Sequence, residues 1–74
     1  MIDIGGKIKR RRIKLGLTQE ELAARTELSK GFFSQLERNL TSPSIATLGD
    51  ILEALGTNLS DFFSEQTEEK VVFG

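Results

Sequence analysis

The chain has 74 residues, a formal net charge of -1 at pH 7, and neither cysteine nor histidine. A chain of this length forms one domain at most and buries only about 60% of the surface that its unfolded form exposes. Without Cys or His it lacks disulfides, thiolate zinc ligands and the usual general base, so we expect no catalysis, no metal and no cofactor.

The small net charge hides an uneven distribution along the chain. Residues 1–40 hold nine Lys and Arg against five Asp and Glu (+4), whereas residues 41–74 hold one against six (-5). This asymmetry predicts a basic face for an anionic partner and an acidic remainder that does not touch it. No secretory signal and no run of about 18 apolar residues is visible, so we expect a cytoplasmic protein without a membrane role.

The first predicted helix covers about residues 5–15. Ile4, Ile8 and Leu15 recur at helical spacing, and Gly16 follows where a left-handed cap would end the helix. Arg11 interrupts this apolar stripe, and Ile13 falls on the opposite side of the helix. The basic run over residues 7–14 is best explained as a solvated helix face that also contacts phosphate.

Two short helices follow, at about residues 19–25 and 30–38. Thr18 and Glu21 have the spacing of a capping box at the start of the first of them, and Ser29 is placed to cap the second. Only three or four residues remain for the turn between the two helices. The pattern is typical of a DNA-reading helix-turn-helix.

Two more helices complete an all-α domain. Ser44 caps a fourth helix that Gly56 ends, and Asn58, with Asp61 three residues later, caps a short fifth helix. Apolar residues recur at helical spacing along the fourth helix and continue into the fifth; they are Ile45, Leu48, Ile51, Leu52, Leu55, Leu59, Phe62 and Phe63. We expect this stripe to supply most of the core.

The outward face of the helix at 30–38 carries only polar side chains and glycine. Gln35 can pair with an adenine edge, Lys30 can reach guanine or a phosphate, and Gly31 allows a close approach of the backbone. Phe32 lies at the flank of this face. It either packs on a thymine methyl group or covers the seam between the first and third helices.

The sequence resembles the Cro and phage-repressor family of helix-turn-helix regulators, also called the xenobiotic-response-element family, over about residues 4–63. The resemblance rests on Gly16-Leu-Thr-Gln-Glu-Glu-Leu-Ala23, on Phe33-Ser-Gln-Leu-Glu-Arg-Asn39, and on Pro43-Ser44, Thr47-Leu48 and Leu55-Gly56. It implies a five-helix, lambda-repressor-like DNA-binding domain at residues 4–64. It also implies a transcriptional regulator of prokaryotic or phage origin, expected to be a repressor, that binds a palindromic operator as a homodimer.

The resemblance also assigns roles to single residues. The base-facing positions are Lys30, Gly31, Phe32, Ser34 and Gln35. Phosphate contacts are expected at Gln19, Ser29, Arg38, Asn39, Thr41 and, if it extends the basic face, Arg11. Arg12 and Glu37 match a structural ion pair between the first and third helices. Asn39 stands where Gly is common, and Asn tolerates the left-handed conformation that the turn requires.

Residues 65–74 differ from the rest in composition. A charged segment is followed by Val71-Val-Phe-Gly74, which resembles the first strand of a C-terminal cupin-type sensor whose effector the sequence does not identify. We therefore expect a charged linker and the start of a truncated second domain, with only a weak dimer contact near Leu59 and Phe62. The alternative function is a protein-interaction or antitoxin-like module that uses the same fold.

Overall fold

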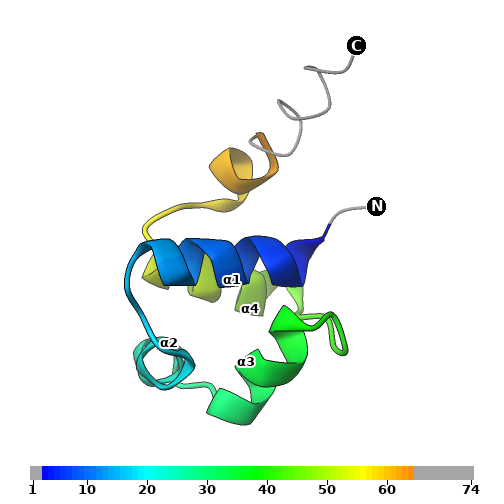
Figure 1. Cartoon of the computed structure of the whole chain (residues 1–74). Coiled ribbons are helices and arrows are strands. Elements are labelled where there is room, and N and C mark those ends of the chain that lie inside the picture. The colour runs from blue at the N-terminus through cyan, green and yellow to red at the C-terminus, as the bar shows by residue number, and fades with distance from the viewer. Residues whose placement is uncertain (1–2, 65–74) are drawn as a thin grey trace.

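The computed structural model describes residues 3–64, which form five helices (Figure 1). They are α1 (Ile4–Lys14), α2 (Gln19–Thr26), α3 (Lys30–Glu37), α4 (Ile45–Ala54) and a short helix at residues 59–64. The all-α fold predicted from the sequence is confirmed, and the predicted bounds of the first three helices differ from those observed by one residue. The expected linker and strand at 65–74 lie outside the described residues.

Side-chain caps begin α2, α3, α4 and the helix at residues 59–64 at the predicted residues. Thr18 and Glu21 form the full capping box of α2, with the Thr18 N–H donating to Glu21 Oε1 at 2.8 Å. Ser29 caps α3 and Ser44 caps α4, and the Asp61 N–H donates to Asn58 Oδ1 at 2.9 Å. Each cap satisfies an N–H group that the first turn of a helix leaves without an intrahelical partner.

Left-handed residues redirect the chain after the helices. Gly16 and Gly56 have φ of 75°, as the sequence predicts for glycines that follow a helix, and Asn39 has φ of 59°. Glu27 also has a positive φ, at 58°, where it ends α2 and begins the turn into α3. This strained position for a side chain other than Gly or Asn was not anticipated from the sequence.

The core gathers one apolar side from every helix. Its fully buried side chains are Ile8, Leu22, Phe33, Leu36, Ile51, Leu52, Leu55 and Phe62. Two residues of the predicted stripes are not part of it: Leu15 is 51% exposed and Ile45 is 70% exposed. Both stand at the end of a helix, at its C-cap or its first residue, where the chain turns away from the core. Helical periodicity alone therefore overestimates burial at helix ends.

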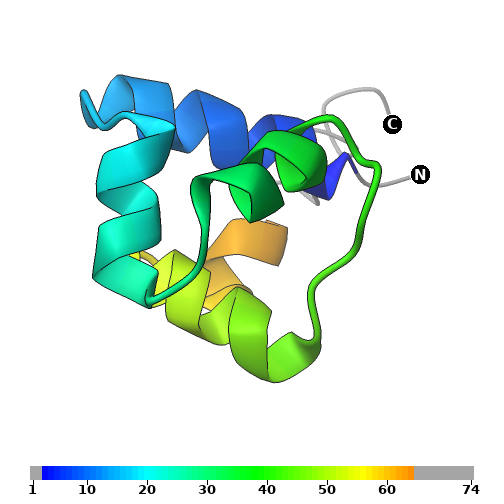
Figure 2. The same ribbon diagram turned by 90° about the horizontal axis from the view of Figure 1, so that it is seen from below.

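α2 and α3 lie together at one end of the molecule. In Figure 1 these two helices lie below α1, while residues 59–64 lie at the opposite end. Seen from below, α3 lies in front, between α1 and α4 (Figure 2). Gly5 allows α1 to approach α3 closely, because a Cβ at this position would collide with the Leu36 carbonyl oxygen. The backbone of α1 therefore rests directly on the backbone of α3.

Candidate nucleic-acid interface

The outer face of α3 is exposed at three of the five positions predicted to face bases. Lys30, Gly31 and Gln35 are exposed, and Ser34 is half-buried. Phe32 is also half-buried; it packs against the core and meets the Phe33 ring edge-on, at 5.7 Å between centroids. The half-buried ring of Phe32 therefore contributes to the core, and its contact with a thymine methyl group stays a prediction.

An ion pair crosses from α2 to α3 on this surface. Lys30 Nζ lies 3.7 Å from Glu20 Oε1, and the two side chains are 62% and 74% exposed. Exposed pairs of this kind contribute little to stability, typically below about 1 kcal/mol. The pair thus leaves Lys30 available while placing one carboxylate beside it.

A buried ion pair fixes α3 to α1 beneath this surface. Arg12 Nε and Nη2 donate to the two carboxylate oxygens of Glu37, at 2.7 and 2.9 Å. The Glu37 side chain is only 3% exposed, and its hydrogen bond raises the pKa of Arg12 above the ordinary value. Arg12 Nη1 also donates to the Leu17 carbonyl oxygen at 2.8 Å. The pair expected from the resemblance is present and joins three segments of the chain.

Gln19 connects the start of α2 to the same ion pair. Its Nε2 donates to Glu37 Oε1 at 3.1 Å, and the residue is half-buried as the first residue of α2. Beside it, the hydrogen bond from the Thr18 N–H lowers the pKa of Glu21 and keeps that carboxylate ionised at the helix N-terminus. The first turn of α2 is therefore fixed by its cap and by its first side chain.

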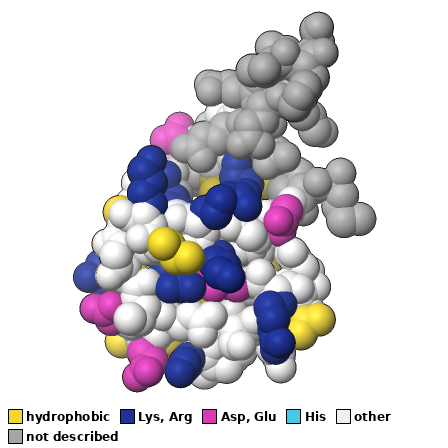
Figure 3. Space-filling view, viewed as in Figure 1, with side chains coloured by type: hydrophobic (Ala, Val, Ile, Leu, Met, Phe, Trp, Pro, Cys, Tyr) yellow, Lys and Arg dark blue, Asp and Glu magenta, His cyan; other side chains and the backbone are white. Residues whose placement is uncertain are grey.

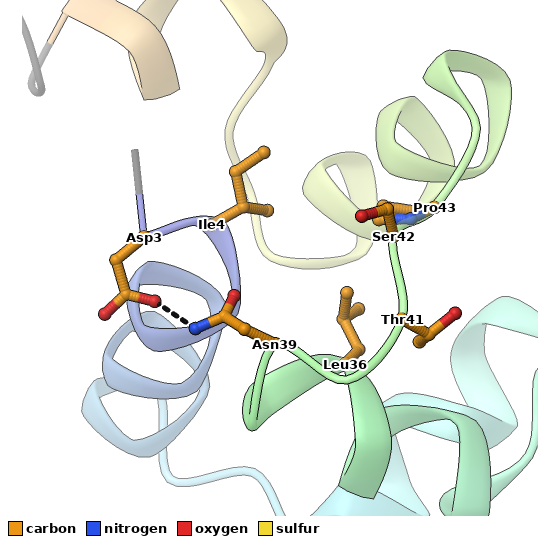
Figure 4. Close-up of a pocket in the computed structure, with 7 residues that line it drawn as sticks. All are labelled: Asp3, Ile4, Leu36, Asn39, Thr41, Ser42 and Pro43. Carbon is orange, nitrogen blue, oxygen red and sulfur yellow. Dashed lines mark hydrogen bonds between the residues drawn. The ribbon is translucent and has the colours of Figure 1, made fainter. Parts of the chain in front are cut away.

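The segment after α3 is held to the start of α1. Asn39 Nδ2 donates to Asp3 Oδ1 at 2.6 Å (Figure 4). Asn39 Oδ1 accepts from the Gly5 N–H at 3.0 Å. The bond from Asn39 lowers the pKa of Asp3, which also caps α1. Thr41 is half-buried farther along the same loop. Asn39 therefore holds α1 against the loop after α3, whether or not it also contacts a phosphate as predicted.

The predicted basic face of α1 is not uniformly solvated. Lys7 is 8% exposed, with Nζ 5.0 Å from the centroid of the Phe62 ring, and Arg11 Nε donates to the Leu55 carbonyl oxygen at 3.1 Å. The prediction of a solvated run is thus wrong at Lys7, because helical spacing turns this position toward residues 59–64. Arg11 binds the end of α4 and is half-buried, as its place in the apolar stripe indicates.

The face shown in Figure 3 carries many Lys and Arg side chains over α1, α2 and α3. Exposed cations of the described chain include Lys9, Arg10, Lys14, Lys30 and Arg38. Arg38, directly after α3, donates from Nε to the Ser34 carbonyl oxygen at 3.3 Å. Such a surface attracts a polyanion over a long range, without regard to its sequence.

The roles of Asp3 and Glu20 were not predicted from the sequence. Asp3 has a readable signal, since an Asp three residues before Gly6 and next to Ile4 has the position of a helix cap. Glu20 has none, because its partner Lys30 belongs to another helix. Within residues 3–64 no group of three or more potential metal ligands comes together, and no helix there is long and apolar enough to cross a membrane.

Two short capped helices joined by a tight turn, with the second presenting a polar face, define a helix-turn-helix domain. The sequence profile of the family described as Helix-turn-helix matches residues 8–62. This chain belongs to that helix-turn-helix family, of the Cro and phage-repressor type that the sequence resembles.

Similar proteins include an uncharacterized HTH-type transcriptional regulator, y4dJ, of Sinorhizobium fredii, which is 40% identical over 74% of this chain and 71% of its own length. The immunity repressor protein of Bacillus phage phi105 is 36% identical over 86% of this chain and 44% of the repressor. The chain thus spans less than half of that repressor.

A solved structure shares the fold. It is the restriction-modification controller protein C.Esp1396I, as a tetramer in complex with its natural 35 base-pair operator. The TM-score is 0.81 at 31% identity, over 90% of this chain and 88% of the controller chain.

Proposed function

We propose that this protein is a sequence-specific regulator of transcription that binds double-stranded DNA with α3 in the major groove. The observation that carries the proposal is the exposed outer face of α3, with Lys30, Gly31 and Gln35, on a helix whose opposite face is buried. A rigidly held helix with a polar outer face matches the dimensions and the hydrogen-bonding groups of the major groove. The protein acts by binding and not by catalysis.

Within this proposal Gln35 reads an adenine edge, and Lys30 reaches guanine or a phosphate. Gly31 has room around it, since a Cβ there would find only Ser29 Oγ, at 3.9 Å. A phosphate binds at the N-terminus of α2, near Gln19, where unpaired backbone N–H groups favour an anion. Arg38 and Thr41 hold the DNA backbone after α3.

Three predicted phosphate contacts are weaker candidates in this interface. The Ser29 hydroxyl accepts from the Phe32 N–H, both polar atoms of the Asn39 side chain are bonded to α1 or its cap, and Arg11 binds Leu55. These protein contacts set the orientation of the three side chains, although the Ser29 hydroxyl hydrogen and the second N–H of Asn39 can still be donated to a phosphate. We assign them to shaping the interface.

We further propose that two copies bind a palindromic operator as a dimer and repress transcription. One recognition helix reads only a few base pairs, so useful specificity needs two helices one turn of DNA apart. The phi105 relative is an immunity repressor, and the C.Esp1396I structure holds a tetramer on its operator. Such a regulator of bacterial or phage origin would act at the nucleoid in the cytoplasm.

The expected dimer contact changes in one respect. Phe62 is 2% exposed and belongs to the core, so it is not available to a second copy, while Leu59 is half-buried. We expect a monomer of 8.2 kDa at micromolar concentration, and cooperative pairing on the palindrome. Sedimentation without DNA tests this, and a tight dimer in its absence would contradict it.

A chain ending at Ser64 should bind the same site, because we propose residues 4–64 as the binding unit.

Selection of bound duplexes from a random library tests the function directly. We expect a palindromic motif and an affinity that falls steeply with salt. Gln35→Ala should weaken binding to the selected duplex by about 1–3 kcal/mol and leave binding to random duplexes nearly unchanged. Recovery of no motif, with salt-independent or absent duplex binding, would favour the protein-interaction alternative.

A further inference from the structure

The strongest unexplained contact in the interface joins Gln19 to a carboxylate that is already paired. Glu37 Oε1 accepts from both Arg12 Nη2 and Gln19 Nε2, at 2.9 and 3.1 Å, while Glu37 Oε2 accepts from Arg12 Nε at 2.7 Å. We propose that Glu37 is a positioning residue for DNA binding, which aims the side-chain amide of Gln19 at a phosphate. This inference rests on the proposed function and deepens it.

Burial makes the carboxylate a fixed point. The Glu37 side chain is 3% exposed, and Arg12 grips it through two parallel hydrogen bonds, an arrangement with little freedom to rotate. A free glutamine side chain loses up to about 2 kcal/mol of rotamer freedom when it is ordered. Because Glu37 already orders Gln19, a ligand that binds its amide avoids much of that cost.

The chemistry of the amide leaves one donor for the DNA. The NH2 group of Gln19 has two N–H bonds, and one of them points to Glu37. The planar amide directs the second N–H away from that carboxylate. Gln19 is the first residue of α2, so this donor lies beside the backbone N–H groups at the helix N-terminus, which favour an anion.

Arg12 makes the arrangement compatible with an anionic ligand. A bare carboxylate close to a phosphate would repel it, but the guanidinium of Arg12 offsets the charge of Glu37 at contact distance. Arg12 also binds the Leu17 carbonyl oxygen, just before α2 begins. The ion pair thus sets both the position and the charge of the proposed phosphate site.

A double-mutant cycle on DNA affinity separates positioning from a purely structural role. Gln19→Ala and Glu37→Gln are each expected to weaken binding to the selected duplex by about threefold to tenfold, the worth of one hydrogen bond. Glu37→Gln replaces the charged acceptor of Gln19 by a single neutral carbonyl oxygen for which Arg12 competes. Because both changes weaken the same contact, the double variant should bind no more weakly than Gln19→Ala. Glu53→Gln, an exposed carboxylate on α4, makes the same change in net charge and is the matched control.

Folding is controlled in the same experiment. Every variant is measured at a temperature where circular dichroism shows it folded, and Glu37→Asp takes the place of Glu37→Gln in the cycle if the latter does not fold. Glu37→Asp keeps the charge but withdraws the carboxylate by one methylene from Gln19. A second readout needs no DNA: the Gln19 side-chain NH2 resonances in NMR should move toward those of exposed glutamines in either Glu37 variant.

The outcomes are distinct. Additive losses in the cycle, with wild-type DNA binding intact, would overturn this inference alone, since Glu37 would then act without Gln19. Unmoved Gln19 NH2 resonances would overturn it as well. Absence of duplex binding by the wild-type protein would overturn the proposed function together with this inference.

Discussion

The two faces of α3 differ in almost every physical respect. Its inner face buries Phe33, Leu36 and Glu37, whereas its outer face exposes Lys30, Gly31 and Gln35. The inner face is hydrogen-bonded to α1 and α2 through Glu37, while on the outer face Lys30 forms a solvent-exposed ion pair with Glu20. Under the proposed function, stability and base recognition belong to different residues of one eight-residue helix.

The comparison implies that outer residues can change without loss of the fold. A regulator can therefore alter its operator by substitution at a few exposed positions, while the inner face keeps the helix at the same depth and angle. Four changes of decreasing expected effect test this division.

Arg12→Ala should have the largest effect, because it leaves Glu37 as an uncompensated buried charge. We expect a loss of about 3 kcal/mol in the free energy of unfolding. Urea denaturation followed by circular dichroism measures it. The paired change Arg12→Met with Glu37→Leu should cost less than Arg12→Ala, since no charge is then left buried. A melting temperature equal to that of the wild type would show that the inner face does not depend on this pair.

Gly5→Ala should destabilise the protein next most strongly. The added methyl group meets the Leu36 carbonyl oxygen, so α1 has to move away from α3, at a cost of about 2 kcal/mol. Gly49→Ala is the matched control, because a Cβ there has no heavy atom within 4 Å. In the middle of α4 that control should stabilise by up to about 1 kcal/mol. Equal effects on the thermal midpoint would contradict the close contact.

Acid should weaken both the bond between Asp3 and Asn39 and the capping box of α2. The pKa values of Asp3 and Glu21 lie below their ordinary values of 3.8 and 4.5, so their ionised forms stabilise the folded state. That contribution is complete above the unfolded pKa and disappears as the pH falls through the folded pKa. Unfolding free energies measured from pH 7 down to about pH 3 should decline, and Asp3→Asn should make the decline shallower. An unchanged slope in Asp3→Asn would argue against the link to Asn39.

Glu20→Gln should have the smallest effect on stability, within about 0.5 kcal/mol, because both partners of its ion pair are exposed. Its effect belongs to recognition: removal of a carboxylate beside Lys30 should raise affinity for random duplexes and steepen the salt dependence. Filter binding at several salt concentrations measures both. Reduced affinity for random DNA would mean that Glu20 helps to hold Lys30 in its binding position.

Helix caps and turns were predicted most reliably from the sequence. The caps at Thr18, Ser29, Ser44 and Asn58 and the left-handed turns at Gly16 and Gly56 follow from interactions among residues at most five apart. Such interactions form in any context that permits a helix, so their positions can be read directly from the sequence. The family pattern added the pairing of Arg12 with Glu37, which no local rule provides.

The sequence by itself therefore determined the helices, their order and the polar face of α3. Only the tertiary structure decided that the apolar side chains of Leu15 and Ile45, at helix ends, are exposed. It also decided that the charged side chain of Lys7 is buried. It also decided the partners across helices, Gln19 with Glu37 and Asn39 with Asp3. The physical reason is range: caps and periodicity act within a turn or two, whereas burial and long-range hydrogen bonds depend on how separate helices pack.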